Sequence, residues 1–258
     1  MKTAILLLGI SLSLIPYSRA GTGIAKETEQ PASTSLVRAA AGGNTQQMSK
    51  LLAAGGSVHA RGSNGETLLI VAAKEGHLDT VGLLMDKGAD PNAVDDMKRS
   101  ALMFAANDGY AKIADLLLEK GARVDLRSDK GRTALHLAAI KGRTSVVKSL
   151  VAKKADIEAM DPYGMTPLLA AIGVDHWDTA RFLVQSGANV TAKLHKTHLT
   201  PLMFAARNPD PALAALLIER GADVNALNQG GVTPLMNAAT SGNDAVVGLL
   251  LKKGARIN

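Results

Sequence analysis

The 258-residue sequence contains no cysteine and few aromatic residues, with one Trp, three Tyr and three Phe. The absence of cysteine excludes disulfide bonds and the attachment of a lipid to a cysteine after leader cleavage. The scarcity of aromatic residues disfavours sandwiches and barrels with a large aromatic core. Alanine, leucine and glycine are abundant instead, which favours small helices that stack closely.

The sequence also lacks an N-terminal apolar run long enough to cross a membrane as a helix. Residues 4–15 are apolar, but a bilayer core of about 30 Å requires roughly 20 residues. The run follows Lys2 and precedes Ser18-Arg19-Ala20, which is the pattern of a secretory signal peptide. We expect residues 1–20 to be a signal peptide cleaved near Ala20, with no membrane insertion afterwards. An uncleaved anchor is the alternative.

No strong excess of either charge is present. The formal net charge is +6, and loss of Lys2 and Arg19 with the leader would lower it to +4. This modest positive balance favours an acidic partner and is too small to indicate binding to nucleic acid. Residues 21–33 carry almost no bulky apolar side chain, so we expect them to form a flexible linker.

The sequence does contain an internal repeat. A Ser or Thr followed two residues later by Leu recurs at spacings of 33, 33, 33, 33, 34 and 33, at Thr34, Thr67, Ser100, Thr133, Thr166, Thr200 and Thr233. Residues 133–139, Thr-Ala-Leu-His-Leu-Ala-Ala, and 166–171, Thr-Pro-Leu-Leu-Ala-Ala, resemble the motif of the ankyrin-repeat family. The resemblance extends over residues 34–258.

This resemblance implies an all-α repeat solenoid, in which helix-turn-helix pairs stack and β-hairpin fingers project between them. We expect an N-terminal capping helix pair at residues 34–60. Six repeats should follow at about 61–93, 94–126, 127–159, 160–192, 193–226 and 227–258. Stability should then be roughly additive along the stack.

The repeated residue types have mechanical roles. The Ser or Thr hydroxyl can cap the first helix, and a following Pro suits its first position. Small alanine pairs allow neighbouring helices to approach, and a Leu-rich triplet in the second helix should form the core. Glycine ends the second helix in the left-handed region. Lys154 takes that place in one unit, at a cost of about 1 kcal/mol.

The six histidines are the first candidates for chemistry. His77 and His176 share one repeat position, and the resemblance implies structural hydrogen bonds for the motif histidine, His136. His195 and His198 could ligate a metal, but two ligands are too few for a closed zinc site. We found no nucleophile beside a base and no phosphate-binding glycine loop. We therefore expect no enzymatic activity, no cofactor and no metal.

The sequence also gives expectations for four further residues. Asp95 and Asp96 resemble a carboxylate pair, but they fall in an expected finger and should form a solvated turn. Asp175 and Pro209 replace the glycine that usually links the paired helices, and Pro209 should stiffen that link. These departures affect local geometry and not the fold.

Partners of ankyrin-repeat proteins usually bind the concave face, made of fingertips and outward positions of the first helices. The resemblance places there Arg99, Arg127, Lys130, Arg132, Lys141, Met160, Tyr163, Met165, Lys193, His195, Lys196 and Arg207. We expect an acidic protein segment to dock across the third to fifth units, with Tyr163 as anchor and Arg132 as charge clamp. The alternative is a solvated surface without a preferred ligand.

The sequence therefore predicts a monomeric, exported scaffold for protein–protein interaction. The expected location is the periplasm or envelope of a Gram-negative bacterium. A secreted effector that binds host proteins is one alternative. An enzyme or small-ligand binder is another, although an open groove encloses a ligand poorly.

Overall fold

A computed structural model describes residues 31–257, which belong to one compact unit. The expected signal peptide and residues 21–30 of the expected linker lie outside the described residues. Within the described part, no helix has the length and apolar character needed to cross a membrane.

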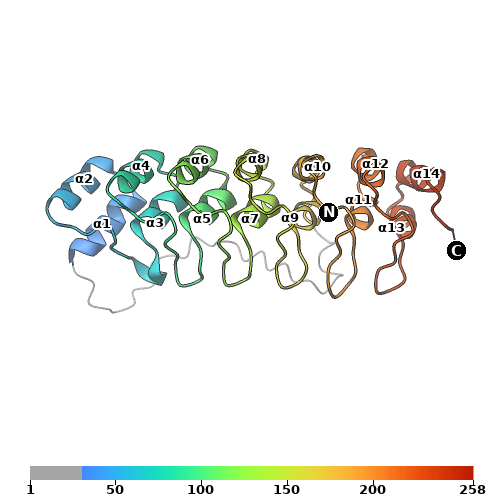
Figure 1. Ribbon diagram of the computed structural model, residues 1–258, viewed down its shortest axis with the longest axis horizontal. Helices are drawn as coiled ribbons and strands as arrows, with labels where there is room; N and C mark the ends of the chain where they lie inside the picture. The colour runs from blue at the N-terminus through green and yellow to red at the C-terminus, as the bar shows by residue number, and fades with distance from the viewer. Residues whose placement is uncertain (1–30, 258) are drawn as a thin grey trace. The chain divides into compact units, whose positions relative to one another are not determined.

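The described residues form fourteen α-helices in consecutive pairs. The helices are α1 (Pro31–Ala41), α2 (Thr45–Ala53), α3 (Leu68–Lys74), α4 (Leu78–Asp86), α5 (Ala101–Asp108), α6 (Ala111–Glu119), α7 (Ala134–Ile140), α8 (Thr144–Ala152), α9 (Pro167–Ile172), α10 (Trp177–Gln185), α11 (Pro201–Ala205), α12 (Ala212–Glu219), α13 (Pro234–Thr240) and α14 (Asp244–Lys252). Figure 1 shows odd-numbered helices in one layer and even-numbered helices in another, with loops projecting from the odd-numbered layer. The prediction of an all-α repeat solenoid is confirmed.

The first helix of each repeat begins as the sequence predicts. Six hydroxyl groups accept a hydrogen bond from the backbone N–H three residues later, and they belong to Thr67, Ser100, Thr133, Thr166, Thr200 and Thr233. Proline is the first residue of α9, α11 and α13. Thr34 differs, because α1 already begins at Pro31 and contains Thr34. The helical region therefore starts before the expected boundary at residue 34, and Thr34 is not an N-cap.

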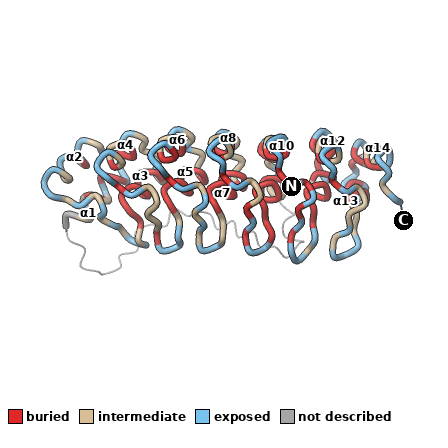
Figure 2. The backbone as a smooth tube through the Cα atoms, viewed as in Figure 1, coloured by how far each residue is buried: buried red, intermediate tan, exposed pale blue. Residues whose placement is uncertain are grey.

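The core is a column of small and apolar side chains. Ala72, Ala105 and Ala138 are 0% exposed, which confirms that alanine allows close approach of neighbouring units. In the second helices the middle leucine of each triplet is fully buried, whereas Leu251, at the end of its triplet, is 42% exposed. The middle leucine is the one buried position common to the triplets, and the third position is buried only in some units, as at Leu118 and Val184. Figure 2 shows the buried residues concentrated in the odd-numbered layer and in the inner parts of the loops.

The ends of the second helices have the backbone conformation that the sequence predicts. Gly88 and Gly121 have φ values of 85° and 92°, and Lys154 has φ 61° in the equivalent place. A positive φ also occurs in the link between paired helices. Asp175, between α9 and α10, has φ 65°, and Gly142, its counterpart in the preceding unit, has φ 63°. Because a side chain is disfavoured at positive φ, Lys154 and Asp175 carry local strain.

Six loops, called fingers below, precede the first helices, at residues 61–67, 94–100, 127–133, 160–166, 193–200 and 227–233. Over the described residues they contain no strand and only two isolated bridges, Arg61 with Thr67 and Val94 with Ser100. Backbone hydrogen bonds join most neighbouring fingers at their tips, as from Asp129 N to Met97 O at 3.0 Å. The fingers therefore form a connected row.

Candidate protein-binding surface on the fingers

A polar side chain inside the finger shapes several of these loops. The Asp95 carboxylate accepts hydrogen bonds from the N–H groups of Met97 and Arg99 at 3.0 and 2.7 Å. Asp161 does the same for Tyr163 and Met165, at 2.9 and 3.0 Å. Asp95 is 4% exposed, whereas Asp96 is exposed. The expectation of a solvated turn was therefore wrong for Asp95 and right for Asp96.

The buried carboxylates also bind two arginines that were predicted to face a partner. Arg99 forms an ion pair with Asp95 at 2.6 Å and lies over the Phe104 ring, 4.6 Å from its centroid. Arg132 forms an ion pair with Asp161 at 3.5 Å, and its side chain is 19% exposed. Because each guanidinium already compensates a buried carboxylate, the interpretation of Arg132 as a charge clamp for a partner is corrected.

Arg127 is exposed but also has a structural role. Its Nη1 donates to the carbonyl oxygens of Gly131, in its own finger, and Met160, in the next finger, at 2.9 and 2.7 Å. Two repeats earlier, Arg61 makes the equivalent pair of bonds, to Gly65 in its own finger and Val94 in the next finger. These arginines link neighbouring fingers, and replacing them would alter the scaffold.

Met165 was predicted at the binding surface, and the structure places it in the interior. It is 6% exposed and directly precedes Thr166, the cap of α9. Leu199 has the same place before Thr200 and is also 6% exposed. The finger re-enters the helical layer at this position, so Met165 cannot contact a partner without rearrangement.

The remaining predicted residues divide between fingers and helix ends. Lys130, Met160, Tyr163, Lys193, His195 and Lys196 are exposed on three consecutive fingers. Lys141, half-buried, follows α7, and the exposed Arg207 follows α11. The structure thus brings the finger residues into one run and places the other two on the first-helix layer.

Hydrogen bonds reveal which residue of the longer finger is the extra one. His195 N donates to Tyr163 O at 3.1 Å, as Asp129 N does to Met97 O in an earlier pair of fingers. Thr197 O accepts from Gln229 N at 3.0 Å, in the same role as Tyr163 O. Lys196 lies between these two positions and has no counterpart in the shorter fingers. The insertion therefore adds an exposed lysine to the tip.

His136 is structural, as the family resemblance implied. It is 0% exposed, and its Nε2 donates to Met165 O at 2.9 Å. Its Nδ1 accepts from Thr133 N at 3.3 Å, which completes a capping box at the start of α7. Burial lowers the pKa of His136, and the Met165 carbonyl opposes that shift only partly. The neutral imidazole therefore fits this site.

A set of side chains that the sequence prediction had not grouped joins the start of a second helix to the end of the first helix of the preceding unit. His77 Nε2 lies 2.9 Å from Ala41 O, and Arg143 Nε donates to Asn107 O at 3.3 Å. His77 covers Gly43, because a Cβ atom there would lie 2.5 Å from its Nδ1. Tyr110, Arg143 and His176 cover the next three linker glycines in the same way. Each covering residue follows its linker glycine by 34 residues, and this constant spacing was the available signal.

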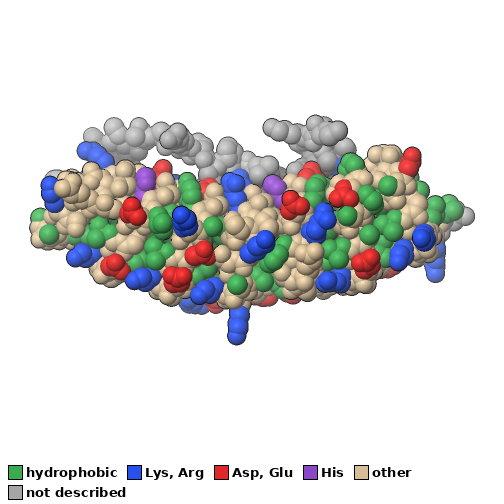
Figure 3. Space-filling view, turned by 90° about the horizontal axis from the view of Figure 1, so that it is seen from above, with side chains coloured by type: hydrophobic (Ala, Val, Ile, Leu, Met, Phe, Trp, Pro, Cys, Tyr) green, Lys and Arg blue, Asp and Glu red, His purple; other side chains and the backbone are tan. Residues whose placement is uncertain are grey.

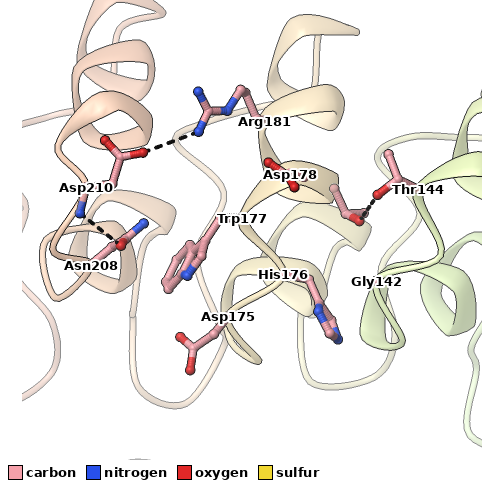
Figure 4. Close-up of a pocket in the computed structure, with 10 residues that line it drawn as sticks. Gly142, Thr144, Asp175, His176, Trp177, Asp178, Arg181, Asn208 and Asp210 are labelled. Atoms are coloured by element: carbon pink, nitrogen blue, oxygen red, sulfur yellow. Dashed lines mark hydrogen bonds and ion pairs between the residues drawn. The ribbon is translucent and has the colours of Figure 1, made fainter.

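This arrangement changes at the joint between α10 and α12. Asp210 stands where His176 stood one unit earlier, and it binds Ala212 N at 2.9 Å and Arg181 at 3.5 Å. A hollow of about 340 Å³ remains, lined by Gly142, Thr144, Asp175, His176, Trp177, Asp178, Thr179, Arg181, Asn208 and Asp210 (Figure 4). The Thr144 and Thr179 hydroxyls bond each other at 2.7 Å. No lining nucleophile is therefore seen paired with a base.

The possible metal ligands also remain dispersed. Among the described residues, no group of three or more His, Asp or Glu side chains could hold a metal ion. His195 packs against the preceding finger, since a Cβ on Gly164 would lie 2.6 Å from its Cδ2. On the face of the even-numbered helices, Figure 3 shows acidic and basic side chains interspersed.

Fold and surface together define a class of protein, a solenoid of helix pairs that presents a row of linked fingers. Comparison with known families gives the same class, because the family described as ankyrin repeats (3 copies) matches residues 36–128, 102–194 and 192–258. The chain belongs to the ankyrin-repeat family, whose members are protein-binding scaffolds. No individual curated protein matches it at a significant level.

Proposed function

We propose that the chain is an exported, non-catalytic scaffold that binds a protein partner along its fingers and first helices. The observation that carries this proposal is the exposure of large apolar side chains on linked fingers. Met97, Met160 and Tyr163 are 48%, 43% and 59% exposed. Methionine and tyrosine are enriched in the centres of protein interfaces. A row of fingers held by hydrogen bonds would present them with little ordering cost.

The leader pattern at residues 1–20 supports export. The proposed destination is the periplasm or envelope. The test is to express the full chain in its native host and to fractionate the cells. Mass spectrometry of the product should find a mature N-terminus at Gly21 in periplasmic extract. A full-length product in the cytoplasm would contradict export. A mature product in the culture medium would favour a secreted effector.

Binding is tested by cross-linking and affinity capture from the compartment in which the chain resides. The double variant Met160→Ala/Tyr163→Ala should lose the partners that the wild-type chain captures. The matched control is Leu251→Ala, because Leu251 lies on α14 and has a similar exposed fraction of 42%. Equal loss of capture with both variants would show that the fingers are not the binding surface.

A further inference from the structure

The cationic side chains of the fingers fall into two groups. Arg61, Arg99, Arg127 and Arg132 donate to carbonyl oxygens or pair with buried carboxylates, as described above. Lys98 is exposed on the finger at 94–100, which also carries the exposed Asp96. Lys130, Lys193 and Lys196 are exposed on later fingers, and none of these four lysines forms an ion pair with another described residue. The arginines hold the fingers together, and the lysines leave their charge available at the tips.

Lys130, Lys193 and Lys196 flank an apolar finger. Met160 occupies the place that Arg127 and Lys193 occupy in the adjoining fingers, and Tyr163 occupies the place of Lys130. Pro162, between them, is also exposed. The finger at residues 160–166 thus has an apolar tip between two basic ones. Its one carboxylate, Asp161, is 3% exposed and already bonded.

Pro162 also interrupts the hydrogen bonds between fingertips. Asp129 N donates to Met97 O, and His195 N donates to Tyr163 O. Pro162 stands in the equivalent donor position opposite Lys130, and proline has no N–H to donate. The Lys130 carbonyl therefore receives no backbone N–H from the next finger. This carbonyl lies between the apolar and basic tips.

We infer that Lys130, Met160, Tyr163, Lys193 and Lys196, here called the basic–apolar patch, bind an extended acidic segment of a partner protein that carries an apolar side chain. This inference rests on the proposed function and names its partner chemistry. Carboxylates of the segment pair with the lysines, and its apolar side chain packs on Met160 and Tyr163. Charge complementarity selects this occupant, because Arg127 and the three lysines face only one exposed carboxylate, Asp129, on these fingers.

A nucleic acid fits the same surface less well. Phosphate backbones are bound by many cations along a continuous basic stripe. Here an apolar fingertip separates the lysines, and the remaining fingers do not extend the charge. The finger at 61–67 carries Arg61 and Glu66, and the finger at 94–100 carries two cations, Lys98 and Arg99, against two carboxylates, Asp95 and Asp96. The finger at 227–233 carries no charged side chain.

The test uses the full mature chain and a fluorescein-labelled peptide of twelve residues, rich in Asp and Glu, with one central Phe. Fluorescence anisotropy should show saturable binding that weakens as salt rises. The triple variant Lys130→Glu/Lys193→Glu/Lys196→Glu should weaken binding at least about tenfold. The control Lys87→Glu/Lys112→Glu/Lys153→Glu has the same net charge but alters lysines of the even-numbered helices. It should leave the affinity within about twofold.

The apolar contact is tested separately. Tyr163→Ala, or replacement of the peptide's Phe by Ala, should each weaken binding about tenfold, and combining them should add little. Equal loss with the control variant, or equal binding of a Lys-rich peptide, would overturn the inference. Equal binding of a single-stranded oligonucleotide would also overturn it and favour a nucleic-acid surface.

The outcome separates this inference from the proposed function. If the partner captured from the cell binds the triple lysine variant undiminished but not Met160→Ala/Tyr163→Ala, the scaffold function stands and the acidic segment is wrong. If capture is insensitive to both variants, the finger surface itself is wrong. Circular dichroism of each variant checks that loss of binding is not loss of folding.

Discussion

The fingers at residues 94–100 and 193–200 are each closed by a backbone hydrogen bond, from Asp95 N to Arg99 O and from Leu194 N to Leu199 O, but they differ in how their charged side chains are used. In the first, Asp95 is buried and bonded to Arg99. In the second, Leu194 takes the place of Asp95, and Lys193 and Lys196 are exposed without an ion-pair partner among the described residues. The same loop can therefore use charged side chains to stabilise the stack, as with Asp95 and Arg99, or expose them, as with Lys193 and Lys196. The exposed Lys98 shows that one finger can do both.

The largest effect should come from removing a buried acceptor. Asp161→Ala leaves the Tyr163 and Met165 N–H groups and the Arg132 guanidinium without their partner. We expect a loss of about 2 to 4 kcal/mol in the free energy of unfolding, measured by urea titration. The exposed Asp129 is the control, and Asp129→Ala should change stability by less than about 0.5 kcal/mol. Equal effects would show that burial does not separate the two carboxylates.

The next largest effect is a dependence of folding stability on pH, and it comes from His136, which donates to Met165 O in the adjoining finger. Burial lowers the pKa of His136 below its usual value near 6.5. The unfolded chain then binds the proton more readily than the folded chain, so stability should decrease as pH falls below about 6.5. The slope should be at most about 1.4 kcal/mol per pH unit from this group. Urea titrations at pH 7.5 and 5.5 measure it.

His136→Gln isolates this contribution. A glutamine at the third helical position can keep the capping box with Thr133 but does not titrate. Burial also lowers the pKa of His176, so some pH dependence should remain in the variant. An unchanged pH dependence after His136→Gln would contradict the assignment.

A smaller change in stability is expected at Lys154, the residue with positive φ that follows α8. Lys154→Gly should raise the free energy of unfolding by about 1 kcal/mol, because glycine tolerates the φ of 61° at this position. Lys153 is adjacent but has φ −89°. Lys153→Gly should therefore lower stability, by up to about 1 kcal/mol. A lower melting temperature for Lys154→Gly would show that the lysine side chain stabilises the cap in another way.

The smallest effect on folding belongs to the exposed lysines. Lys130→Ala, Lys193→Ala and Lys196→Ala should each change the free energy of unfolding by less than about 0.5 kcal/mol. Arg132→Ala should be clearly destabilising, since it leaves Asp161 buried without its ion pair. Thermal melts of the four variants would show the comparison directly. Similar destabilisation by all four variants would contradict the distinction between arginines that hold the fingers together and lysines that are exposed at the tips.

Local rules explain what the sequence predicted well. The caps from Thr67 to Thr233 and the left-handed position of Lys154 depend on residues within a few positions, and the repeat of 33 displays each rule several times. The exposed Lys130 and Tyr163 were found from the same offsets. Such features need no knowledge of the neighbouring unit.

Contacts between units explain what was missed. Arg132 pairs with Asp161, 29 residues away, only after two fingers have stacked. The burial of Met165 likewise depends on where the finger re-enters the helical layer. An Asp, Asn or Ser precedes several caps by five residues, as Asp95 precedes Ser100 and Asn228 precedes Thr233. That spacing could have predicted the bonded turn but not its arginine partner.

Hydrogen exchange with and without the acidic, Phe-containing peptide tests the central claim most directly, because it reports on every finger at once. The account predicts slower amide exchange in residues 127–133, 160–166 and 193–200, and no change in residues 61–67 and 227–233. Protection that is equal along all fingers, or confined to the even-numbered helices, would contradict it.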